Sequence, residues 1–126
     1  MKRRNFLQLT GGLASALALG AVPEIIGNLK GRAYFNDWRA LPGMSLVLTL
    51  EVEEPEKTIV ELIVKDNNGS HTVAQSQGAP SLNVVVPLLK TNQESYTLFA
   101  RVVDLSGHGL DSDPVEVIAE SFQFGL

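Results

Sequence analysis

Cysteine is absent from this chain of 126 residues. The protein can therefore form no disulfide, no thiolate metal site and no cysteine nucleophile, and its fold must rest on its apolar core. Positive charge is also scarce, because ten lysines and arginines are outnumbered by fourteen aspartates and glutamates, for a formal net charge of -4 at pH 7. Without a basic cluster to offset this acidity, binding to nucleic acid is disfavoured.

Sequence motifs that build common active sites are missing as well. The chain has no glycine-rich phosphate loop, no dinucleotide-binding fingerprint and no serine in a Gly-x-Ser-x-Gly turn. We therefore predict a protein without a cofactor and without catalytic activity.

The first 21 residues have the three parts of a secretory signal. A positively charged start with Lys2, Arg3 and Arg4 is followed by a weakly apolar stretch and then by small residues. This stretch is too short and too rich in glycine for a stable membrane span, which takes about 20 largely apolar residues. Arg3 and Arg4, followed by Phe6 and Leu7, resemble the twin-arginine signal peptides of bacteria and archaea. The resemblance implies export to the periplasm or the cell surface; an ordinary secretory signal, an uncleaved anchor and a cytoplasmic protein with a basic start remain as alternatives.

The remaining residues, 22–126, have the length of a single domain. Removing residues 1–21 takes away three positive charges and no negative one, which moves the formal net charge from -4 to -7. Such an acidic domain repels nucleic acid and anionic lipid surfaces.

From Met44 onward, apolar residues recur at every second position, which puts them on one face of an extended chain. This pattern assigns Met44 and Leu88 to the inward rows together with the leucines and valines between them. With an earlier segment around Arg32 to Trp38, it predicts about seven strands, at residues 32–38, 44–52, 58–65, 71–77, 82–88, 96–103 and 115–119.

Turn residues separate these segments. Asn68-Gly69 predicts a tight hairpin because both residues tolerate positive φ, and Ser106 to Gly109 predicts another turn. Pro87 is expected at a free sheet edge because proline donates no ladder hydrogen bond. Short strands with turns about every ten residues indicate an all-β protein, a single immunoglobulin-like antiparallel β-sandwich.

The segment from Leu89 to Asp104 resembles a specific part of fibronectin type III and related immunoglobulin-like domains, the corner that leads into strand F. In those domains a tyrosine at the start of the strand returns its hydroxyl group to backbone a few residues upstream. Tyr96 stands at that position, followed by the alternating Leu98, Ala100 and Val102. The resemblance implies the same hydrogen bond here.

One cluster in the sequence contains possible metal ligands: Asp104, His108, Asp111 and Asp113. Carboxylate oxygens suit Ca²⁺, but the spacing does not fit the twelve-residue calcium loop. Asp, Ser and Gly also form ordinary turns, so we predict a polar hairpin without a metal. A copper or zinc site would need His108 together with His71, the other histidine.

Aromatic residues are few, and most of those in the mature domain lie near its two ends. Tyr34, Phe35 and the single tryptophan, Trp38, precede the first long strand, and Phe122 and Phe124 lie near the C-terminus. Aromatic side chains of this kind either pack on the core or anchor a partner interface.

These observations favour an exported, non-catalytic protein-interaction module, either an accessory subunit or an envelope-surface binding domain. One alternative is a surface subunit that assembles by strand exchange through an open sheet edge. A second is a small metal-dependent periplasmic enzyme that uses the Asp104–Asp113 loop.

Overall fold

The computed structural model describes residues 6–7, 25–89 and 93–119. Nearly all of these residues lie in β-strands or in the turns between them, and the single helical segment in this part of the chain is the 3₁₀ turn η3 (Pro55–Lys57). The predicted all-β class is therefore confirmed. The strands are β1 (Phe6–Leu7), β2 (Gly27–Asn28), β3 (Arg32–Phe35), β4 (Arg39–Ala40), β5 (Ser45–Glu51), β6 (Thr58–Asp66), β7 (Gly69–Gln77), β8 (Ser81–Val85), β9 (Ser95–Asp104), β10 (His108–Asp111) and β11 (Val115–Ile118).

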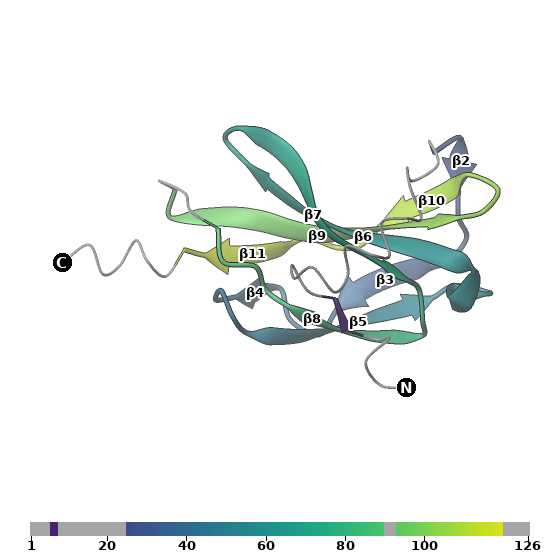
Figure 1. Ribbon diagram of the computed structural model, residues 1–126, viewed down its shortest axis with the longest axis horizontal. Helices are drawn as coiled ribbons and strands as arrows, with labels where there is room; N and C mark the ends of the chain where they lie inside the picture. The colour runs from purple at the N-terminus through teal and green to yellow at the C-terminus, as the bar shows by residue number, and fades with distance from the viewer. Residues whose placement is uncertain (1–5, 8–24, 90–92, 120–126) are drawn as a thin grey trace.

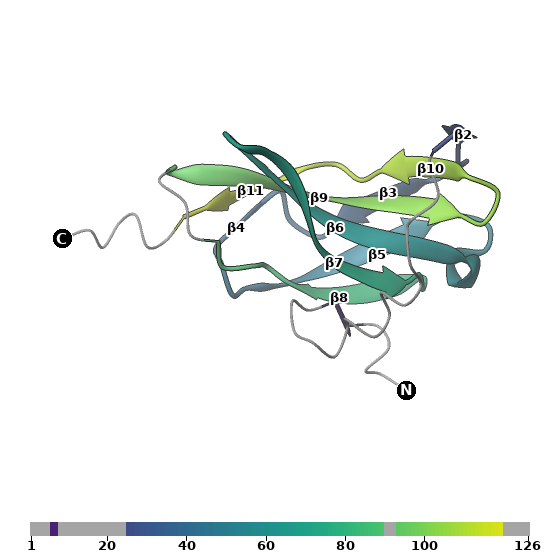
Figure 2. The ribbon, with the colours of Figure 1, turned by 45° about the horizontal axis from the view of Figure 1, so that its top comes forward.

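The strands form two sheets, stacked face to face as a sandwich (Figures 1 and 2). The first sheet has four strands in the order β1-β8-β5-β3. In the second sheet, β6 lies between β7 and β9, and the other side of β9 pairs with β10 near one end and with β11 near the other. The long strands pair antiparallel, as predicted. The two-residue strands β1, β2 and β4 add parallel pairs with β8, β10 and β11, which the sequence did not predict.

The core between the sheets follows the two-residue alternation. In β5, Leu46, Leu48 and Leu50 are almost completely buried, whereas Ser45 and Glu51 are exposed. The facing rows come from β6 and β9, and their inward side chains are equally buried: Val60, Leu62, Val64, Leu98, Ala100 and Val102. Each such leucine stabilises the fold by about 1.5–3 kcal/mol relative to an exposed position.

Two local predictions were wrong, each where the alternation runs past the end of a strand. Met44 and Leu88 are exposed because β5 begins only at Ser45 and β8 ends at Val85. The Pro87 side chain is buried, and its carbonyl oxygen accepts a hydrogen bond from the Tyr96 hydroxyl.

The predicted strand over residues 32–38 ends at Phe35, and a second short strand, in the other sheet, follows at Arg39 and Ala40. β3 pairs with β5, and β4 pairs with β11 after the chain turns at Asn36 to Trp38. The Asn36 side chain supports this change, because its Oδ1 accepts the backbone N–H of Val47 at 2.9 Å. Residues 108–109, predicted as turn, begin the strand β10.

The predicted hairpin connects β6 and β7 through the two residues Asn67 and Asn68. Of the two residues expected to take positive φ, only Gly69 does so, at 109°, and it is already paired with Asp66. The Asp66 carboxylate accepts the backbone N–H of Asn68 at 2.8 Å, which holds the turn without a left-handed asparagine.

The sandwich has two distinct ends, because β6 and β9 run antiparallel over their whole paired length (Figure 1). The Leu105 end contains the β9–β10 turn with Leu105, the 3₁₀ turn and Gly78. The Trp38 end contains Trp38, the turn at residues 41–44, the segment 86–89 and the β6–β7 hairpin. The pairing of Thr58 with Asp104 and of Lys65 with Thr97 fixes this arrangement.

Candidate functional site

The structure places the predicted metal loop in the β9–β10 turn at the Leu105 end. Asp104 Oδ1 accepts two backbone N–H groups, from Ser106 and from His108, each at 2.9 Å. The hydrogen bond from the His108 N–H is the main reason why the pKa of Asp104 lies below its usual value. The imidazole of His108 lies 3.6 Å from the other carboxylate oxygen. The Asp104 carboxylate therefore stabilises the β9–β10 turn through hydrogen bonds within that turn.

The other two carboxylates of the loop have different surroundings. Asp111, on β10, pairs with Arg101 on β9, whose Nε and Nη2 lie 2.9 Å and 3.3 Å from its two oxygens. Asp113 is exposed in the link to β11. Within residues 25–89 and 93–119, no three His, Asp or Glu side chains are grouped to hold a metal ion.

The two histidines lie at opposite ends of the sandwich. His71 lies near the β6–β7 hairpin, with Nε2 3.6 Å from Asp66 Oδ1, whereas His108 begins β10. Because His71 pairs with Val64, and Thr58 at the other end of β6 pairs with Asp104 beside His108, the two histidines lie about 20 Å apart along β6, at 3.3 Å per residue. The structure thus does not bring them together.

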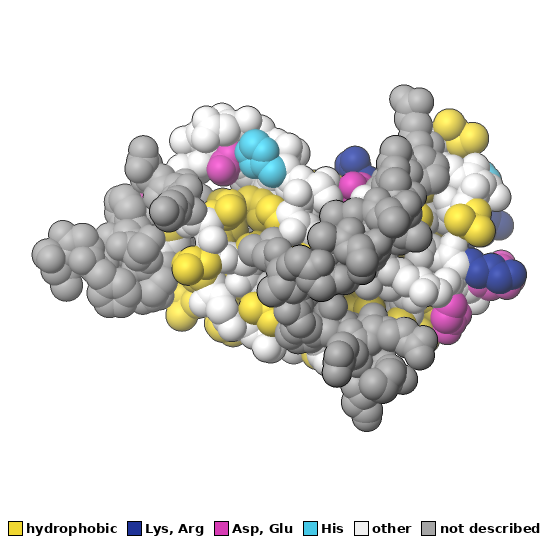
Figure 3. Space-filling view, viewed as in Figure 1, with side chains coloured by type: hydrophobic (Ala, Val, Ile, Leu, Met, Phe, Trp, Pro, Cys, Tyr) yellow, Lys and Arg dark blue, Asp and Glu magenta, His cyan; other side chains and the backbone are white. Residues whose placement is uncertain are grey.

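A groove of about 160 Å³ lies beside the β9–β10 turn. On the face shown in Figure 3, the charged side chains gather mainly toward this end. In the groove, Lys57 pairs with Glu54 at 3.3 Å, and Asp104 is held by its turn, so these charged groups already have partners. Its lining residues are Leu29, Val52, Glu53, Glu54, Lys57, Thr58, Asp104, Leu105 and Ser106.

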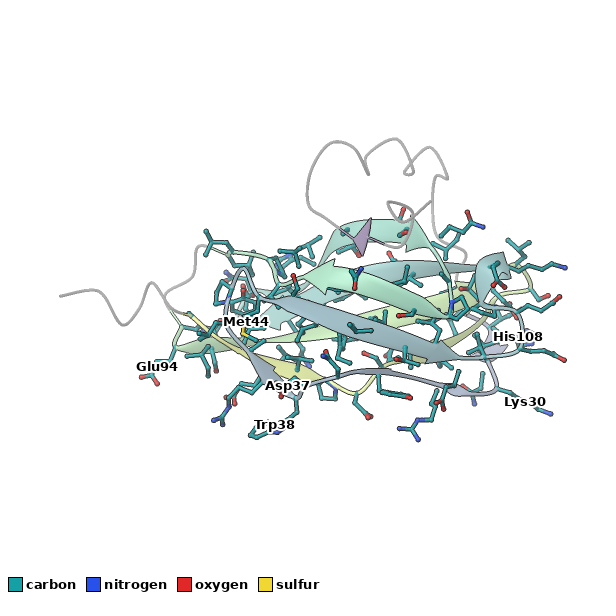
Figure 4. All side chains as sticks on the ribbon, turned by 90° about the horizontal axis from the view of Figure 1, so that it is seen from below. Lys30, Asp37, Trp38, Met44, Glu94 and His108 are labelled. Atoms are coloured by element: carbon teal, nitrogen blue, oxygen red, sulfur yellow. The ribbon has the colours of Figure 1, made fainter. Side chains whose placement is uncertain are left out.

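The Trp38 end carries large apolar side chains that remain in contact with solvent. Trp38 is 66% exposed and Leu88 is 72% exposed, and Leu41 and Met44 are exposed as well. Leu41 and Met44 belong to one tight turn, in which the Met44 N–H donates to the Leu41 carbonyl oxygen at 3.1 Å. Figure 4 shows Trp38 pointing away from the sandwich at the same end as Met44, far from His108. We call these four residues, Trp38, Leu41, Met44 and Leu88, the Trp38 patch.

The indole ring of Trp38 is held in place although it is exposed. The Arg39 guanidinium carbon lies 4.5 Å from the ring centroid, a cation–π contact. Arg39 is itself fixed by Glu116 on β11, because its Nε and Nη2 each lie 3.1 Å from Glu116 Oε1. Both backbone groups of Trp38 are bonded as well, since its N–H donates to Asp37 Oδ1 at 2.8 Å and its carbonyl oxygen accepts the Glu116 N–H at 2.9 Å. An exposed aromatic ring in a fixed position loses little conformational entropy on binding.

The aromatic residues predicted as a partner interface lie in different environments in the structure. Phe35 is buried in the core. Tyr34 is half-buried on β3, where its hydroxyl donates to Glu51 Oε2 at 2.8 Å and Arg32 lies over its ring at 4.4 Å. Phe122 and Phe124 lie outside the described residues. Of the predicted set, Trp38 is thus the one side chain that is largely exposed within the described residues.

Sequence reasoning missed Leu41, Met44 and Leu88 as surface residues. The signal that could have found them is proline and glycine at strand ends: Pro42-Gly43 lies within the turn, and Pro87 directly precedes Leu88. A strand ends where the chain reaches such a proline or glycine, so the next apolar side chain does not have to point into the core.

The residues of the predicted export signal lie mostly outside the described part, including Arg3 and Arg4. Phe6 and Leu7 form β1 and pair in parallel with Asn83 and Val84 of β8. No helix in the described part of the chain combines the length and apolar character that crossing a bilayer takes.

Comparison with known proteins gives little similarity. Neither a scan against protein families nor a search of curated protein sequences finds a match. Among solved structures, CopC from Methylosinus trichosporium OB3b is similar over 78% of this chain and 83% of its own, with 16% sequence identity and a TM-score of 0.34. At this level the likeness carries no argument, and the fold assignment rests on the strand pairing described above.

Proposed function

We propose that this chain is an exported, non-catalytic protein-interaction module, an accessory subunit or an envelope-surface binding domain, and that the Trp38 patch is its partner surface. The single observation that carries the proposal is the largely exposed indole of Trp38, held against Arg39, at an end of the sandwich that carries further exposed apolar side chains. Tryptophan is among the residues that most often dominate the energy of protein–protein interfaces.

The arrangement around Trp38 suits a protein partner. A polar pair, Arg39 and Glu116, borders the ring, and Leu41 and Met44, in the turn that follows β4, add exposed apolar side chains at the same end. An apolar centre with a charged rim is the usual composition of such interfaces. The methionine adds a flexible side chain that adapts to the shape of the partner.

The export part of the proposal rests on the leader. Replacing Arg3 and Arg4 together by lysine keeps the charge and removes the paired guanidinium groups. If the twin-arginine route is used, this double variant accumulates in the cytoplasm as the uncut precursor, detected by fractionation and immunoblotting. Unchanged export of the double variant would instead indicate an ordinary secretory signal.

The partner surface is tested by capture followed by reconstitution. Envelope proteins of the producing cells are cross-linked to the tagged full-length chain, a partner recovered in stoichiometric amount is purified, and its affinity is measured by calorimetry. We expect Trp38→Ala to weaken binding by about 2 kcal/mol, or about 30-fold, as for other central interface tryptophans. Trp38→Phe keeps an aromatic ring and is expected to lose less.

Leu105→Ala is the matched control, because Leu105 is as exposed as the patch residues but lies at the opposite end. It should leave the affinity unchanged. A partner that binds Trp38→Ala as tightly as the original chain, and Leu105→Ala more weakly, would move the partner surface to the Leu105 end. The absence of a stoichiometric partner in every fraction would contradict the interaction module itself.

A further inference from the structure

The outer edge of β8 is the second feature that points to binding. β8 borders the first sheet, with β5 on its inner side and the two-residue strand β1 on its outer side. Beyond the two residues paired with β1, the described part of the chain places no strand along this edge.

The hydrogen bonds of β5 show which backbone groups of β8 point outward. The N–H and C=O of Val47 face β3, because they bond to the Asn36 side chain and the Asn36 N–H. In an antiparallel sheet this direction alternates, so Leu46 and Leu48 bond to their partners Val84 and Leu82. The backbone groups of Ser81, Asn83 and Val85 therefore point to the outer edge.

β8 also lacks the features that normally protect an edge strand. Such strands carry charged side chains, a proline or a bulge, which disfavour pairing with another chain. β3 and β4 carry Arg32 and Arg39, and the pairing of β6 with β7 shifts register between Leu62 and Ile63. The sequence of β8, Ser-Leu-Asn-Val-Val, has no charge and no proline.

We propose that the outer edge of β8 is a strand-acceptor site, and that its occupant in the mature protein is the segment Phe122–Leu126 of a second copy of this chain. In that segment Phe122, Phe124 and Leu126 alternate with Gln123 and Gly125, a pattern that gives one apolar face to an added strand. The pairing of Phe6 and Leu7 with Asn83 and Val84 already places an apolar segment of this chain along this edge.

Chain length favours a second copy over the protein's own C-terminal segment. Only Glu120 and Ser121 separate Ala119 from Phe122, so this link spans about 10 Å when extended. β11 lies on the side of β9 away from β6, whereas β8 follows β7 through the three residues 78–80 on the opposite flank. To reach β8 of its own chain, the link would have to cross from one sheet to the other, about 10 Å, and also pass at least two strand spacings of about 4.8 Å. The link is too short for this.

The leader fits this scheme as the temporary occupant of the same edge. While residues 1–21 are attached, β1 covers Asn83 and Val84, and removal of the leader opens the acceptor. The inference therefore uses the export step of the proposed function but not the Trp38 patch, which lies just before β4 and in the 41–44 and 86–89 segments.

The test compares four forms of the protein by analytical ultracentrifugation over a range of concentrations. A chain of residues 22–126 keeps every buried residue of the core cluster, which runs from Ala33 to Val117, so it retains the complete sandwich. We expect it to associate, and we expect a chain of residues 22–119 and the full chain 1–126 to remain monomeric at the same concentrations. The fourth form, Asn83→Lys in residues 22–126, places a charge on the exposed edge and should weaken association at least tenfold.

Thr72→Lys is the matched control, since it adds the same charge to an exposed position of the edge strand β7 in the other sheet. A synthetic peptide of residues 120–126 should bind the 22–119 chain and not its Asn83→Lys variant, and a peptide with both phenylalanines replaced by serine should not bind. Folding of each variant is checked by circular dichroism and thermal unfolding.

The outcomes separate this inference from the proposed function. Association that persists without residues 120–126, or that is lost with Thr72→Lys but not with Asn83→Lys, overturns the strand-acceptor site. A monomeric 22–126 chain that does not bind the peptide overturns it as well, and neither result affects partner binding through Trp38.

Discussion

The two ends of the sandwich are closed in different ways. At the Leu105 end, backbone segments approach so closely that a Cβ atom at Gly31 would lie 2.1 Å from the Glu51 carbonyl oxygen, and one at Gly78 would lie 2.3 Å from that of Pro55. At the Trp38 end, a Cβ atom at Gly43 would meet no atom within 4 Å, and large apolar side chains stay exposed. The comparison shows that close backbone contacts leave no room for added atoms at one end, while the other end is open and keeps large apolar side chains exposed.

The largest loss of stability should come from a substitution that adds atoms where backbone segments lie in close contact at the Leu105 end. Gly78→Ala places a methyl group 2.0 Å from Thr58 Oγ1 and against the Pro55 backbone, so these segments have to separate. We expect a loss of about 3 kcal/mol in the free energy of unfolding, measured by urea denaturation. Gly43→Ala, at the open end, meets no atom and has only the cost of its positive φ of 88°, about 1 kcal/mol. Equal losses for the two variants would remove the distinction between the ends.

A second prediction concerns the part of the Trp38 end that is rigid. Tyr96→Phe leaves the buried carbonyl oxygen of Pro87 without its donor, which should cost about 1–3 kcal/mol in the free energy of unfolding. Tyr34→Phe, whose hydroxyl group is exposed, should change the stability less. The segment 86–89, which contains Leu88 of the Trp38 patch, is thus anchored by this hydrogen bond and by the two that join Val86 to Gly43 and Met44.

Tyr96 also predicts a loss of stability at alkaline pH. Burial of the phenol raises its pKa from the ordinary 10 to about 12. Because the unfolded chain ionises first, the contribution of Tyr96 is fully present below pH 10 and is lost as the pH rises from 10 to about 12. Tyr96→Phe should flatten this part of the pH–stability curve, and an unchanged slope would contradict the assignment.

A smaller effect is expected at the β9–β10 turn. Asp104→Ala removes the acceptor of two backbone N–H groups, so the variant should be less stable than the original chain, by less than Tyr96→Phe. The lowered pKa of Asp104 stabilises the folded state above its ordinary value of 3.8, and this contribution is lost as the pH falls through the folded-state pKa. Asp104→Asn keeps an acceptor oxygen and should lose the acid dependence alone.

The smallest effect on stability is expected at Trp38 itself. Because the side chain is largely exposed, Trp38→Ala should change the free energy of unfolding by no more than about 0.5 kcal/mol. Trp38 is the only tryptophan, so its fluorescence reports directly on the patch. A large destabilisation would show that the ring supports the fold, and would weaken the case for a partner surface.

Much of the fold could be predicted because period-2 alternation is a local property. The rows through Leu46–Leu50, Val60–Val64 and Leu98–Val102 lie inward as predicted, and the Tyr96 hydroxyl bonds upstream as the family resemblance implied. The candidate site was predicted less well. Trp38 was among the predicted residues, but Met44 and Leu88 had been assigned to the core, since alternation does not mark where a strand ends.

The sequence by itself determined the all-β class, the inward rows and the hairpin at Asn68-Gly69, because side-chain period and turn chemistry act between neighbours in the chain. Only the tertiary structure decided that residues 32–40 divide between two sheets, that the two histidines lie at opposite ends, and that Asp111 pairs with Arg101. These outcomes depend on the register between strands distant in sequence. That register is set by how the two sheets pack together and not by any single segment.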